Sequence, residues 1–570
     1  MKTRWGNNLN PDAILSEYPR PQMVRDHYLI LNGFWNYAIT ESSEQPAQFD
    51  GDILVPFSPE SELSGVNRIL TKDQYLWYRR EIVLPDDFLL DHLLLHFGAV
   101  DQKATVYLNG IEVGSHLGGF TPFSLDITMA WQKNDRNILT VKVQDTTDFS
   151  WNTRGKQRWK PGGIWYSPQS GIWQTVWLES VPYDFIQSIQ ITPDFDAACV
   201  RFFICSERNL PCLLEISGSE FRFPSNEPVT VPMPNFIPWT PDQPYLYSFT
   251  AQLADDKVNG YFGMRKFSVG SDSDGKKRFF LNNQPIFLSG LLDQGYYSDG
   301  LLTAPSDEAM IYDIQTAKSM GFNLLRKHVK IEPLRWYYHC DRLGMIVWQD
   351  MPNGGKAYKD WLISAPVVVN FRINDRHYKW LGRKEKASRE QYLVELEEMI
   401  RHLYNVVSIG MWVPFNEGWG QFDAVEVTKQ IQKMDPSRTI DSASGWFDQF
   451  TGDFLSRHVY FKKYRYKKDK LNRAVILSEF GGYSYRVEGH VYSENNFGYK
   501  QFKSEEEFQK AFISLYENEV IPFKVKGLTA AVYTQLSDVE DELNGLLSYD
   551  REVIKISPEI VREINQRLLS

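Results

Sequence analysis

The chain has 570 residues, of which 42% are hydrophobic, 24% are charged and 14% are aromatic. This length exceeds what one hydrophobic core can organise and predicts about three or four domains. A net charge of −10 and a pI near 5.6 exclude a general electrostatic attraction to nucleic acid. No run approaches 18 apolar residues, so we expect no membrane span.

The cysteines and the N-terminal residues indicate the compartment in which the protein is expected. The four cysteines are too few for a disulfide framework in a chain of this length, and their spacing does not fit a zinc site. The first 25 residues are polar and lack the apolar core of a signal peptide. We therefore expect a cytoplasmic protein without a metal or a cofactor.

The first part of the chain, from Leu29 to Leu178, consists of short alternating runs separated by turns. Asn109-Gly110, which follows Ala104 to Leu108, is the strongest hairpin signal in the sequence. Regular strand spacing without helical patterns predicts an antiparallel β-sandwich. A smaller β-rich segment follows, from Tyr183 to Val269, with its last strand expected near Phe262 to Phe267; its size fits an immunoglobulin-like sandwich.

From about Phe279 onwards, strand patterns alternate with helical ones, which predicts parallel strands and crossover helices. Ser306 to Met320 has helical spacing, with Ser306 or Asp307 as the N-cap and Gly321 as the stop. About 290 residues of this alternation is the size of one eight-stranded (β/α)8 barrel.

Two apolar strands in this region each lead to a glutamate. The run Val406 to Trp412 leads to Asn416-Glu417-Gly418, and Ala474 to Ser478 leads directly to Glu479, 62 positions later. A single glutamate at a strand end is as often a loop cap or an ion-pair partner as a catalyst. Two carboxyl groups at strand ends of one barrel, however, are what glycoside hydrolysis requires.

Motifs spread over the chain resemble those of glycoside hydrolase family 2, the family of β-galactosidases, β-glucuronidases and β-mannosidases. No single motif is decisive, but their order and spacing together are specific. The matching stretches, in chain order, are Arg20-Pro21-Gln22, Leu31-Asn32-Gly33-Phe34-Trp35, Trp77-Tyr78-Arg79-Arg80, Val106-Tyr107-Leu108-Asn109-Gly110, Gly118-Gly119-Phe120-Thr121-Pro122-Phe123, Gly171-Ile172-Trp173, Gly321-Phe322-Asn323, Asn416-Glu417-Gly418-Trp419 and Glu479-Phe480-Gly481.

The resemblance implies a multidomain fold of three parts. These are an N-terminal jelly-roll sandwich of the sugar-binding type over residues 1–181, an immunoglobulin-like β-sandwich over 182–274, and a catalytic (β/α)8 TIM barrel over 275–570. It also implies that Glu417 is the general acid/base and Glu479 the nucleophile of a retaining hydrolase. Their carboxyl groups should then lie about 5–5.5 Å apart. Asn416 is expected to hydrogen-bond the sugar 2-hydroxyl.

Five further residues are candidates for substrate binding: His328, Asp350, Trp446, His458 and Tyr483. His328 and Asp350 end early barrel strands, where either can hydrogen-bond a sugar hydroxyl. A structural histidine is the alternative for His328, and a core residue is the alternative for Trp446. Tyr483 lies just past the nucleophile strand and could line the pocket.

The pattern departs from known specificities of the family. Where many galactoside-cleaving members have a serine-histidine pair after the second strand, this chain has Arg326-Lys327-His328, and Gln349-Asp350 replaces an acidic pair after the third. This puts a galactosidase assignment and its magnesium site in doubt. Residues 542–546 lack the lysine of the glucuronidase carboxylate clamp, which disfavours a glucuronidase, although Lys327 or the basic loop at 462–468 could supply the cation instead. The sugar stays open.

The favoured hypothesis is an exo-acting retaining β-glycosidase of the β-galactosidase type, with a glycoside or oligosaccharide as its partner and neither nucleic acid nor membrane. A β-glucuronidase or another family 2 specificity is the alternative within the family. A catalytically silent carbohydrate-binding protein and an oligomerisation scaffold are alternatives from other classes, and a homo-oligomer stays open. The loop from Asn353 to Ser388 is either a lid over the pocket or an insertion.

Overall fold

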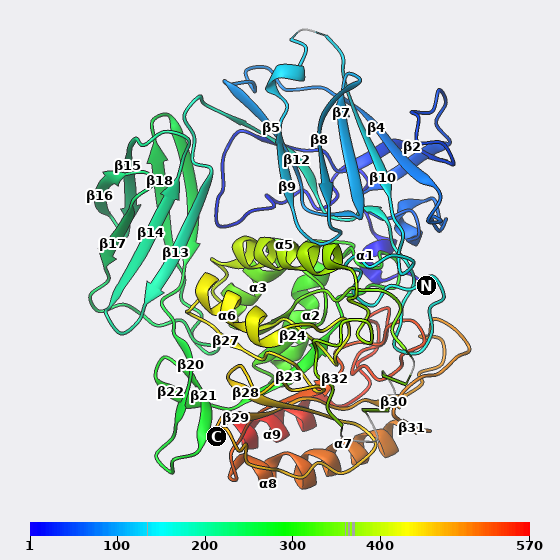
Figure 1. The fold of residues 1–570 in the computed structure, drawn as a ribbon, viewed down its shortest axis with the longest axis vertical. Helices are drawn as coiled ribbons and strands as arrows, with labels where there is room; N and C mark the ends of the chain where they lie inside the picture. The colour runs from blue at the N-terminus through cyan, green and yellow to red at the C-terminus, as the bar shows by residue number, and fades with distance from the viewer. Residues whose placement is uncertain (134, 360, 363–364, 367–370) are drawn as a thin grey trace.

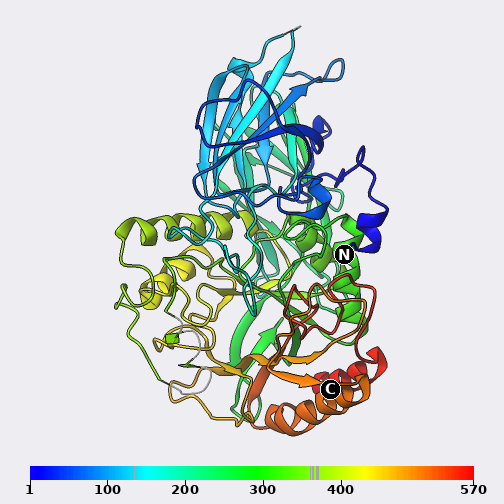
Figure 2. The ribbon, with the colours of Figure 1, turned by 90° about the vertical axis from the view of Figure 1, so that its right-hand side faces the viewer.

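The computed structural model describes residues 1–133, 135–359, 361–362, 365–366 and 371–570. The described chain forms three bodies, with the N-terminal sandwich at the top of Figure 1, a smaller sandwich at the left and the barrel below. Figure 2 shows the N-terminal sandwich standing on the helices of the barrel, with the N-terminus at their junction. The positions of the expected boundaries at 181/182 and 274/275 stay predictions.

The N-terminal body is a sandwich of two antiparallel sheets with strand orders β1-β12-β5-β9 and β3-β2-β4-β10-β7-β8. Inward-facing residues such as Val141 and Leu95 are fully buried between the sheets. Its elements are α1 (Arg4–Asn7), β1 (Tyr28–Ile30), β2 (Gly33–Thr40), β3 (Gly51–Val55), η1 (Glu62–Ser64), β4 (Tyr75–Ile82), β5 (His92–Phe97), β6 (Val100–Asp101), β7 (Lys103–Leu108), β8 (Ile111–Leu117), β9 (Phe123–Asp126), η2 (Thr128–Ala130), β10 (Asn137–Gln144), β11 (Gly171–Ile172) and β12 (Val176–Val181).

The predicted hairpin at Asn109-Gly110 is confirmed: it joins β7 to β8, which pair in antiparallel register. Both turn residues have positive φ, 53° at Asn109 and 79° at Gly110, as this class of two-residue turn requires. Asn109 also fixes the turn, since its side-chain oxygen accepts a hydrogen bond from the Ile138 backbone N–H at 2.8 Å.

The second body is a seven-stranded sandwich with sheets β13-β14-β17 and β16-β15-β18-β19, followed by the small sheet β20-β21-β22. The strand expected at Phe262 to Phe267 was wrong, because the chain leaves the sheet at Gly263 to pass against Val407 of the barrel. The strands are β13 (Ser188–Asp194), β14 (Cys199–Cys205), β15 (Pro211–Ile216), β16 (Ser219–Pro224), β17 (Pro228–Pro232), β18 (Tyr247–Leu253), β19 (Asp256–Phe262), β20 (Phe267–Ser271), β21 (Lys277–Leu281) and β22 (Gln284–Ile286).

The third body is built on eight parallel strands in the order β27-β26-β25-β24-β23-β32-β29-β28. The elements are β23 (Leu288–Asp293), α2 (Asp307–Ser319), β24 (Leu324–Lys327), α3 (Leu334–Leu343), β25 (Ile346–Asp350), α5 (Lys386–Leu403), β26 (Ile409–Val413), α6 (Ala424–Met434), β27 (Thr439–Ile440), β28 (Phe454–Val459), β29 (Ala474–Gly481), β30 (Tyr483–Tyr485), β31 (Lys500–Phe502), α7 (Glu505–Glu519), α8 (Ile521–Lys524), β32 (Leu528–Thr534) and α9 (Pro558–Leu569).

The barrel strands read as apolar runs because they are buried on both faces; every residue of β26, β29 and β32 is buried. The first crossover helix confirms its predicted cap, since Ser306 precedes α2 and its hydroxyl accepts a hydrogen bond from the Ala309 N–H. At the seam between β27 and β28, Ser444 Oγ lies 3.1 Å from Nε2 of His458 and so links the two ends of the sheet.

One irregular segment of the N-terminal sandwich, residues 145–170 between β10 and β11, reaches the barrel. Thr153 forms a bridge with Gly354, and the backbone N–H of Arg154 donates to the carbonyl of Asn353 at 2.9 Å. Helix α5 supports the same junction, because Thr121 and Thr153 both donate hydrogen bonds to its glutamates. The sandwich is thereby held over the carboxyl ends of the barrel strands.

Candidate active site

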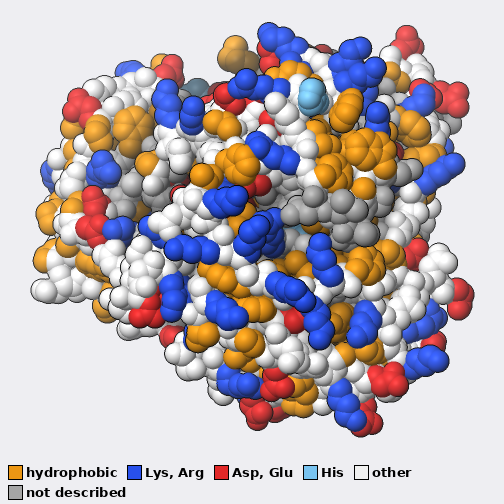
Figure 3. Space-filling model, turned by 60° about the horizontal axis from the view of Figure 1, so that its bottom comes forward, with side chains coloured by type: hydrophobic (Ala, Val, Ile, Leu, Met, Phe, Trp, Pro, Cys, Tyr) orange, Lys and Arg blue, Asp and Glu red, His pale blue; other side chains and the backbone are white. Residues whose placement is uncertain are grey.

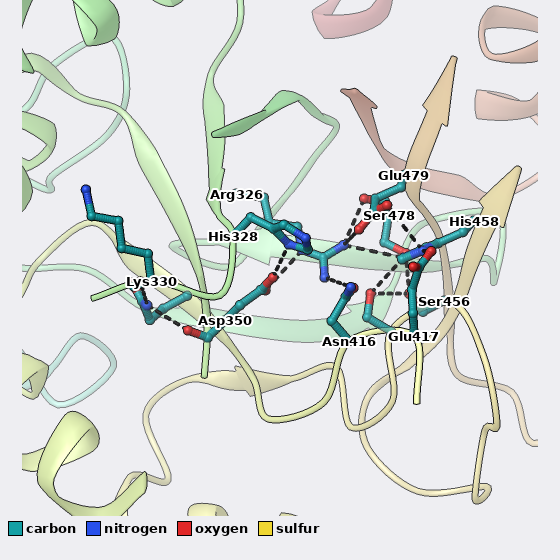
Figure 4. Close-up of polar contacts among 12 residues, drawn as sticks. Arg326, His328, Lys330, Asp350, Asn416, Glu417, Ser456, His458, Ser478 and Glu479 are labelled. Carbon is teal, nitrogen blue, oxygen red and sulfur yellow. Dashed lines mark hydrogen bonds and ion pairs between the residues drawn. The ribbon is translucent and has the colours of Figure 1, made fainter. Parts of the chain in front are cut away.

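Glu417 and Glu479 meet at the carboxyl ends of the barrel strands (Figure 4). Glu479 is part of β29, and Glu417 follows β26 by four residues. Both side chains are buried, with 8% and 4% exposure. A carboxylate oxygen of one lies within 4.8 Å of a carboxylate oxygen of the other. A separation this short is compatible with the close carboxyl spacing of a retaining glycosidase.

The backbone at Glu417 is held in an unusual conformation. Its φ is 51°, in the left-handed region that glutamate rarely adopts, and the next residue, Gly418, has a φ of 72°. The Glu417 N–H donates to the Ser444 carbonyl at 2.9 Å, which fixes the turn. Such conformations persist at functional sites where surrounding contacts enforce them.

Arg326, on β24, is the hub of the site. Its Nε donates to Oδ1 of Asp350 at 3.0 Å, one Nη to Oε1 of Glu479 at 3.1 Å, and the other Nη to Oδ1 of Asn416 at 2.7 Å. The guanidinium is fully buried, and its planar fork orients all three partners at once. The sequence analysis assigned no role to Arg326, although a cation inside an apolar strand was a usable signal.

Three of the predicted substrate-binding residues belong to this network. Asp350 accepts from Arg326 with one oxygen, and its other oxygen lies 2.7 Å from Nδ1 of His328. Asn416 precedes Glu417 in the chain and accepts from the guanidinium, and its amide nitrogen is buried without a hydrogen-bond partner in the described structure. That nitrogen is free to donate to a ligand, as expected for a residue that binds a sugar hydroxyl.

His458, on β28, contacts both glutamates. Its Nδ1 lies 2.7 Å from Oε1 of Glu417 and 3.4 Å from Oε2 of Glu479. On the other side of the ring, Nε2 faces a nitrogen of Arg326 at 3.4 Å. Because a guanidinium can only donate, Nε2 accepts, and the proton of the neutral ring is on Nδ1 and points to the carboxylates.

The pKa values of the two glutamates follow from burial and from these neighbours. Burial raises the pKa of Glu417 to about 7, against the opposing charges of Lys156 and Arg326. Burial also raises the pKa of Glu479 above its usual value, and His458 and Arg326 act in the opposite direction. Burial lowers the pKa of His458 to about 4, so this ring is neutral near pH 7.

Tyr460 completes the surroundings of Glu479. Its hydroxyl donates to Oε2 of Glu479, and its ring stacks on Tyr499 with centroids 3.7 Å apart. Glu479 therefore receives hydrogen bonds from Arg326 and Tyr460, both of which favour its ionised form. Tyr499, which comes from a distant loop, carried no signal in the sequence.

The two remaining substrate-binding candidates, Trp446 and Tyr483, have different surroundings. Trp446 packs edge-on against His458, with centroids 5.3 Å apart, and so borders the site. Positive φ angles at Gly481 and Gly482 turn the chain at the end of β29, and the Tyr483 ring packs against Phe502; its place in the pocket stays a prediction. Among the described residues, Tyr483 forms no hydrogen bond with either glutamate; its backbone N–H donates to the Tyr533 hydroxyl.

The loop Asn353 to Ser388 lies partly outside the described residues, at 360, 363–364 and 367–370. Its described residues Leu362, Ile373 and Leu381 form a small apolar cluster with Trp446 and Phe447. This part of the loop therefore packs on the rim of the site; whether the loop acts as a lid stays a prediction.

The N-terminal sandwich contributes a wall that the sequence analysis missed. Trp165, from the segment 145–170, packs against Trp419 with centroids 5.0 Å apart, and the hydroxyl of Tyr166 donates to Glu542 beyond β32. Lys156 lies 5.2 Å from the Tyr166 ring centroid and 6.0 Å from that of Trp419. Nothing in the sequence places these residues beside the glutamates, since they follow a strand of another domain.

Glu417, His458 and Glu479 form the one cluster in the described chain whose ligand atoms are close enough to hold a metal ion. The same atoms are those that acid/base chemistry requires, and the His458 proton already points at the carboxylates. Within the described residues, no helix combines the length and the apolar character that crossing a membrane requires.

A parallel eight-stranded barrel with two buried carboxylates at its strand ends is the architecture of many glycoside hydrolases. Two family models match the sequence: "Glycosyl hydrolases family 2, TIM barrel domain" over residues 274–553 and "Glycosyl hydrolase 2 galactose-binding domain-like" over residues 53–177. The chain belongs to glycoside hydrolase family 2.

Relatives and solved structures agree with this placement. A β-glucuronidase of Paenibacillus borealis is 26% identical over 398 residues, 64% of this chain and 63% of that protein. A β-galactosidase of Thermoanaerobacter pseudethanolicus is 26% identical over 451 residues, 73% and 55% of the two chains. The chain thus spans less than two thirds of these relatives. The structure of a β-glucuronidase from an uncultured Clostridium matches 96% of this chain and 99% of its own, with a TM-score of 0.73 and 19% identity, and so supports the fold.

Proposed function

We propose that the protein is an exo-acting β-glycosidase that retains anomeric configuration by double displacement through a covalent glycosyl-enzyme. The observation that supports this most directly is the buried pair Glu417 and Glu479, with carboxylate oxygens within 4.8 Å of each other. The names of its relatives divide between β-glucuronidase and β-galactosidase.

In the first step, Glu479 attacks the anomeric carbon while Glu417 gives its proton to the departing oxygen. The two environments suit these roles. Arg326 and the Tyr460 hydroxyl stabilise the ionised form of Glu479. Glu417, whose pKa is raised to about 7 by burial, still holds a proton near neutral pH.

In the second step, the ionised Glu417 accepts a proton from water, whose oxygen attacks the anomeric carbon and releases Glu479. His458 suits this exchange, because its Nδ1 lies 2.7 Å from Oε1 of Glu417 and the proton on Nδ1 stabilises the carboxylate left by the first step. Asn416, positioned by Arg326, has an unpaired amide nitrogen to donate to the sugar. The segment 145–170 closes one side of the site, which favours removal of a terminal sugar.

The proposal is tested with Glu417→Ala on a series of aryl β-glycosides. We expect kcat/KM for poor leaving groups to fall by about 10²–10⁴-fold, since these need protonation, and to fall far less for dinitrophenyl glycosides. Azide should restore turnover by forming the β-glycosyl azide. An equal loss for all leaving groups, without azide rescue, would contradict the role of Glu417.

The pH dependence follows from the same group. Glu417 must be protonated for the first step, so kcat/KM for a glycoside with a poor leaving group should fall as the pH rises through about 7. A pH profile between 4 and 9 measures this. A basic limb that persists unchanged in Glu417→Ala would assign it to another group.

A further inference from the structure

Four lysine side chains in the described chain are buried, and one of them differs from the rest. Lys327 pairs with Asp293 and Glu332, Lys330 pairs with Glu332, and Lys555 pairs with Asp538. Lys156 is 5% exposed, and among the described residues its ammonium group contacts the rings of Tyr166 and Trp419 but forms neither an ion pair nor a hydrogen bond. A buried ammonium group is normally paired, because its desolvation is otherwise uncompensated.

Lys156 lies at the catalytic centre. Burial raises the pKa of Glu417, and of the charges that oppose this effect the charge of Lys156 is the strongest. Burial is the main cause that lowers the pKa of His328, and the charge of Lys156 is the next largest cause. The ammonium group lies 5.2 Å from the Tyr166 ring centroid and 6.0 Å from that of Trp419, and the Trp419 ring in turn contacts His328, with centroids 6.2 Å apart.

The position of Lys156 is fixed by its neighbours in the chain. The backbone N–H groups of Arg154 and Gly155 both donate to the carbonyl of Asn353, at 2.9 and 3.1 Å. The Gly155 backbone has a φ of 61°, and a Cβ there would lie 2.9 Å from the Val329 carbonyl oxygen, so this close approach requires glycine. A cation held this rigidly is preorganised for a ligand.

We infer that Lys156 is a specificity-determining residue whose ammonium group pairs with a carboxylate carried by the substrate. This inference rests on the proposed glycosidase function. Neither Glu542 nor Glu540 forms an ion pair with the lysine in the described structure: Glu542 accepts from Tyr166 and Asn544, and Glu540 accepts from the Ser167 N–H at 2.9 Å. The carboxylate can be on the terminal sugar, as in a uronide, or on the leaving group.

A second observation agrees with an anionic substrate. A hollow of about 570 Å³ lies against β28 and shares His458 and Trp446 with the site. The chain as a whole has a net charge of −10. The charged residues that line this hollow are nevertheless all cations: Arg457, Lys462, Lys463, Arg465 and Lys467. Lys and Arg side chains gather across the middle of the lower face of the molecule, and Asp and Glu lie mostly toward its edges (Figure 3).

The test compares wild type with Lys156→Met, which removes the charge and keeps the length of the side chain. The substrates are nitrophenyl β-glucuronide and β-galacturonide, with the anion on the sugar, carboxyphenyl β-galactoside, with the anion on the leaving group, and uncharged nitrophenyl β-galactoside and β-glucoside. We expect kcat/KM to fall by about 10–100-fold for the preferred anionic substrate, mainly through KM, and by much less for the uncharged ones. If the loss falls on the uronides, the carboxylate is on the sugar; if it falls on carboxyphenyl β-galactoside, the carboxylate is on the leaving group.

Two further variants control for other roles. Lys156→Arg keeps the charge and should retain part of the preference for the anionic substrate. Lys103→Met removes an exposed charge from β7 of the same sandwich and should change none of the rates. Two results would overturn the inference. One is that Lys156→Met loses kcat/KM equally on charged and uncharged substrates. The other is that wild type cleaves the uncharged glycosides with a kcat/KM at least equal to that for every anionic one.

Binding separates this inference from the proposed function. If wild type cleaves no glycoside, the glycosidase proposal fails, and titration calorimetry with glucuronate, galacturonate, galactose and carboxyphenyl β-galactoside still tests Lys156. Uronate binding that is tighter than galactose binding and is lost in Lys156→Met would support the inference. Equal binding of glucuronate, galacturonate, galactose and carboxyphenyl β-galactoside would overturn it.

Discussion

Glu479→Gln should reduce turnover on every aryl glycoside by at least about 10⁴-fold, because a carboxamide cannot attack the anomeric carbon. The substitution keeps the volume of the side chain and one of the two oxygens that accept from Arg326 and Tyr460, so the fold should be retained. The measurement is kcat/KM on the aryl β-glycosides that wild type cleaves, with thermal unfolding as a check of the fold.

The matched control is Glu563→Gln, at an exposed position of α9 far from the site in sequence, which should leave the rates unchanged. Glu479→Gln should also fail to accumulate a glycosyl-enzyme with a 2-fluoro glycoside, which mass spectrometry measures. A well-folded Glu479→Gln that turns over like wild type would remove the nucleophile assignment and with it the proposed mechanism.

Arg326→Met should have the second large effect, on stability and on activity together. It leaves Asp350 and Glu479 buried without their cation, and breaking a buried pair from one side typically costs about 3–5 kcal/mol. It also releases Asn416 and Glu479 from their common donor, so we expect kcat/KM to fall by about 10²–10³-fold. Thermal unfolding and steady-state kinetics measure the two effects.

The pH dependence distinguishes this role from a merely structural one. Without Arg326 the pKa of Glu479 rises further, so the acidic limb of the activity profile should move to higher pH. The folded-state pKa values of Asp350 and Glu479 are already raised by burial, so the stability lost in Arg326→Met should grow as the pH rises and the carboxyls ionise. Arg326→Lys should recover part of the stability; an unshifted acidic limb would contradict the electrostatic role of Arg326.

Much of the fold was predictable because the patterns behind it are local. The two glutamates follow apolar runs, and Ser306 caps α2 as its position before a helical pattern indicates. His458 was found in the same way, at the end of a short strand. The local pattern did not reveal the turn after Glu479, where Gly481 and Gly482 redirect the chain and the Tyr483 ring packs on Phe502.

The contacts that organise the site are not local, and no pattern within one segment reveals them. Arg326 and Glu479 are 153 positions apart, and Arg326 and Asn416 are 90 apart. Lys156 comes from a loop of a different domain, where a lysine in a polar segment looks like any surface residue. Only the docking of that loop on Asn353 brings Lys156 to Glu417.

The segment 145–170 also bears on how such proteins diverge. It leaves the N-terminal sandwich, lines the reaction centre with Lys156, Trp165 and Tyr166, and returns to the sandwich at β11. Recombination that exchanged this sandwich for that of a relative would keep both glutamates and yet replace one wall of the sugar pocket. The two domains therefore have to be inherited together, and selection for a new sugar can act on either one.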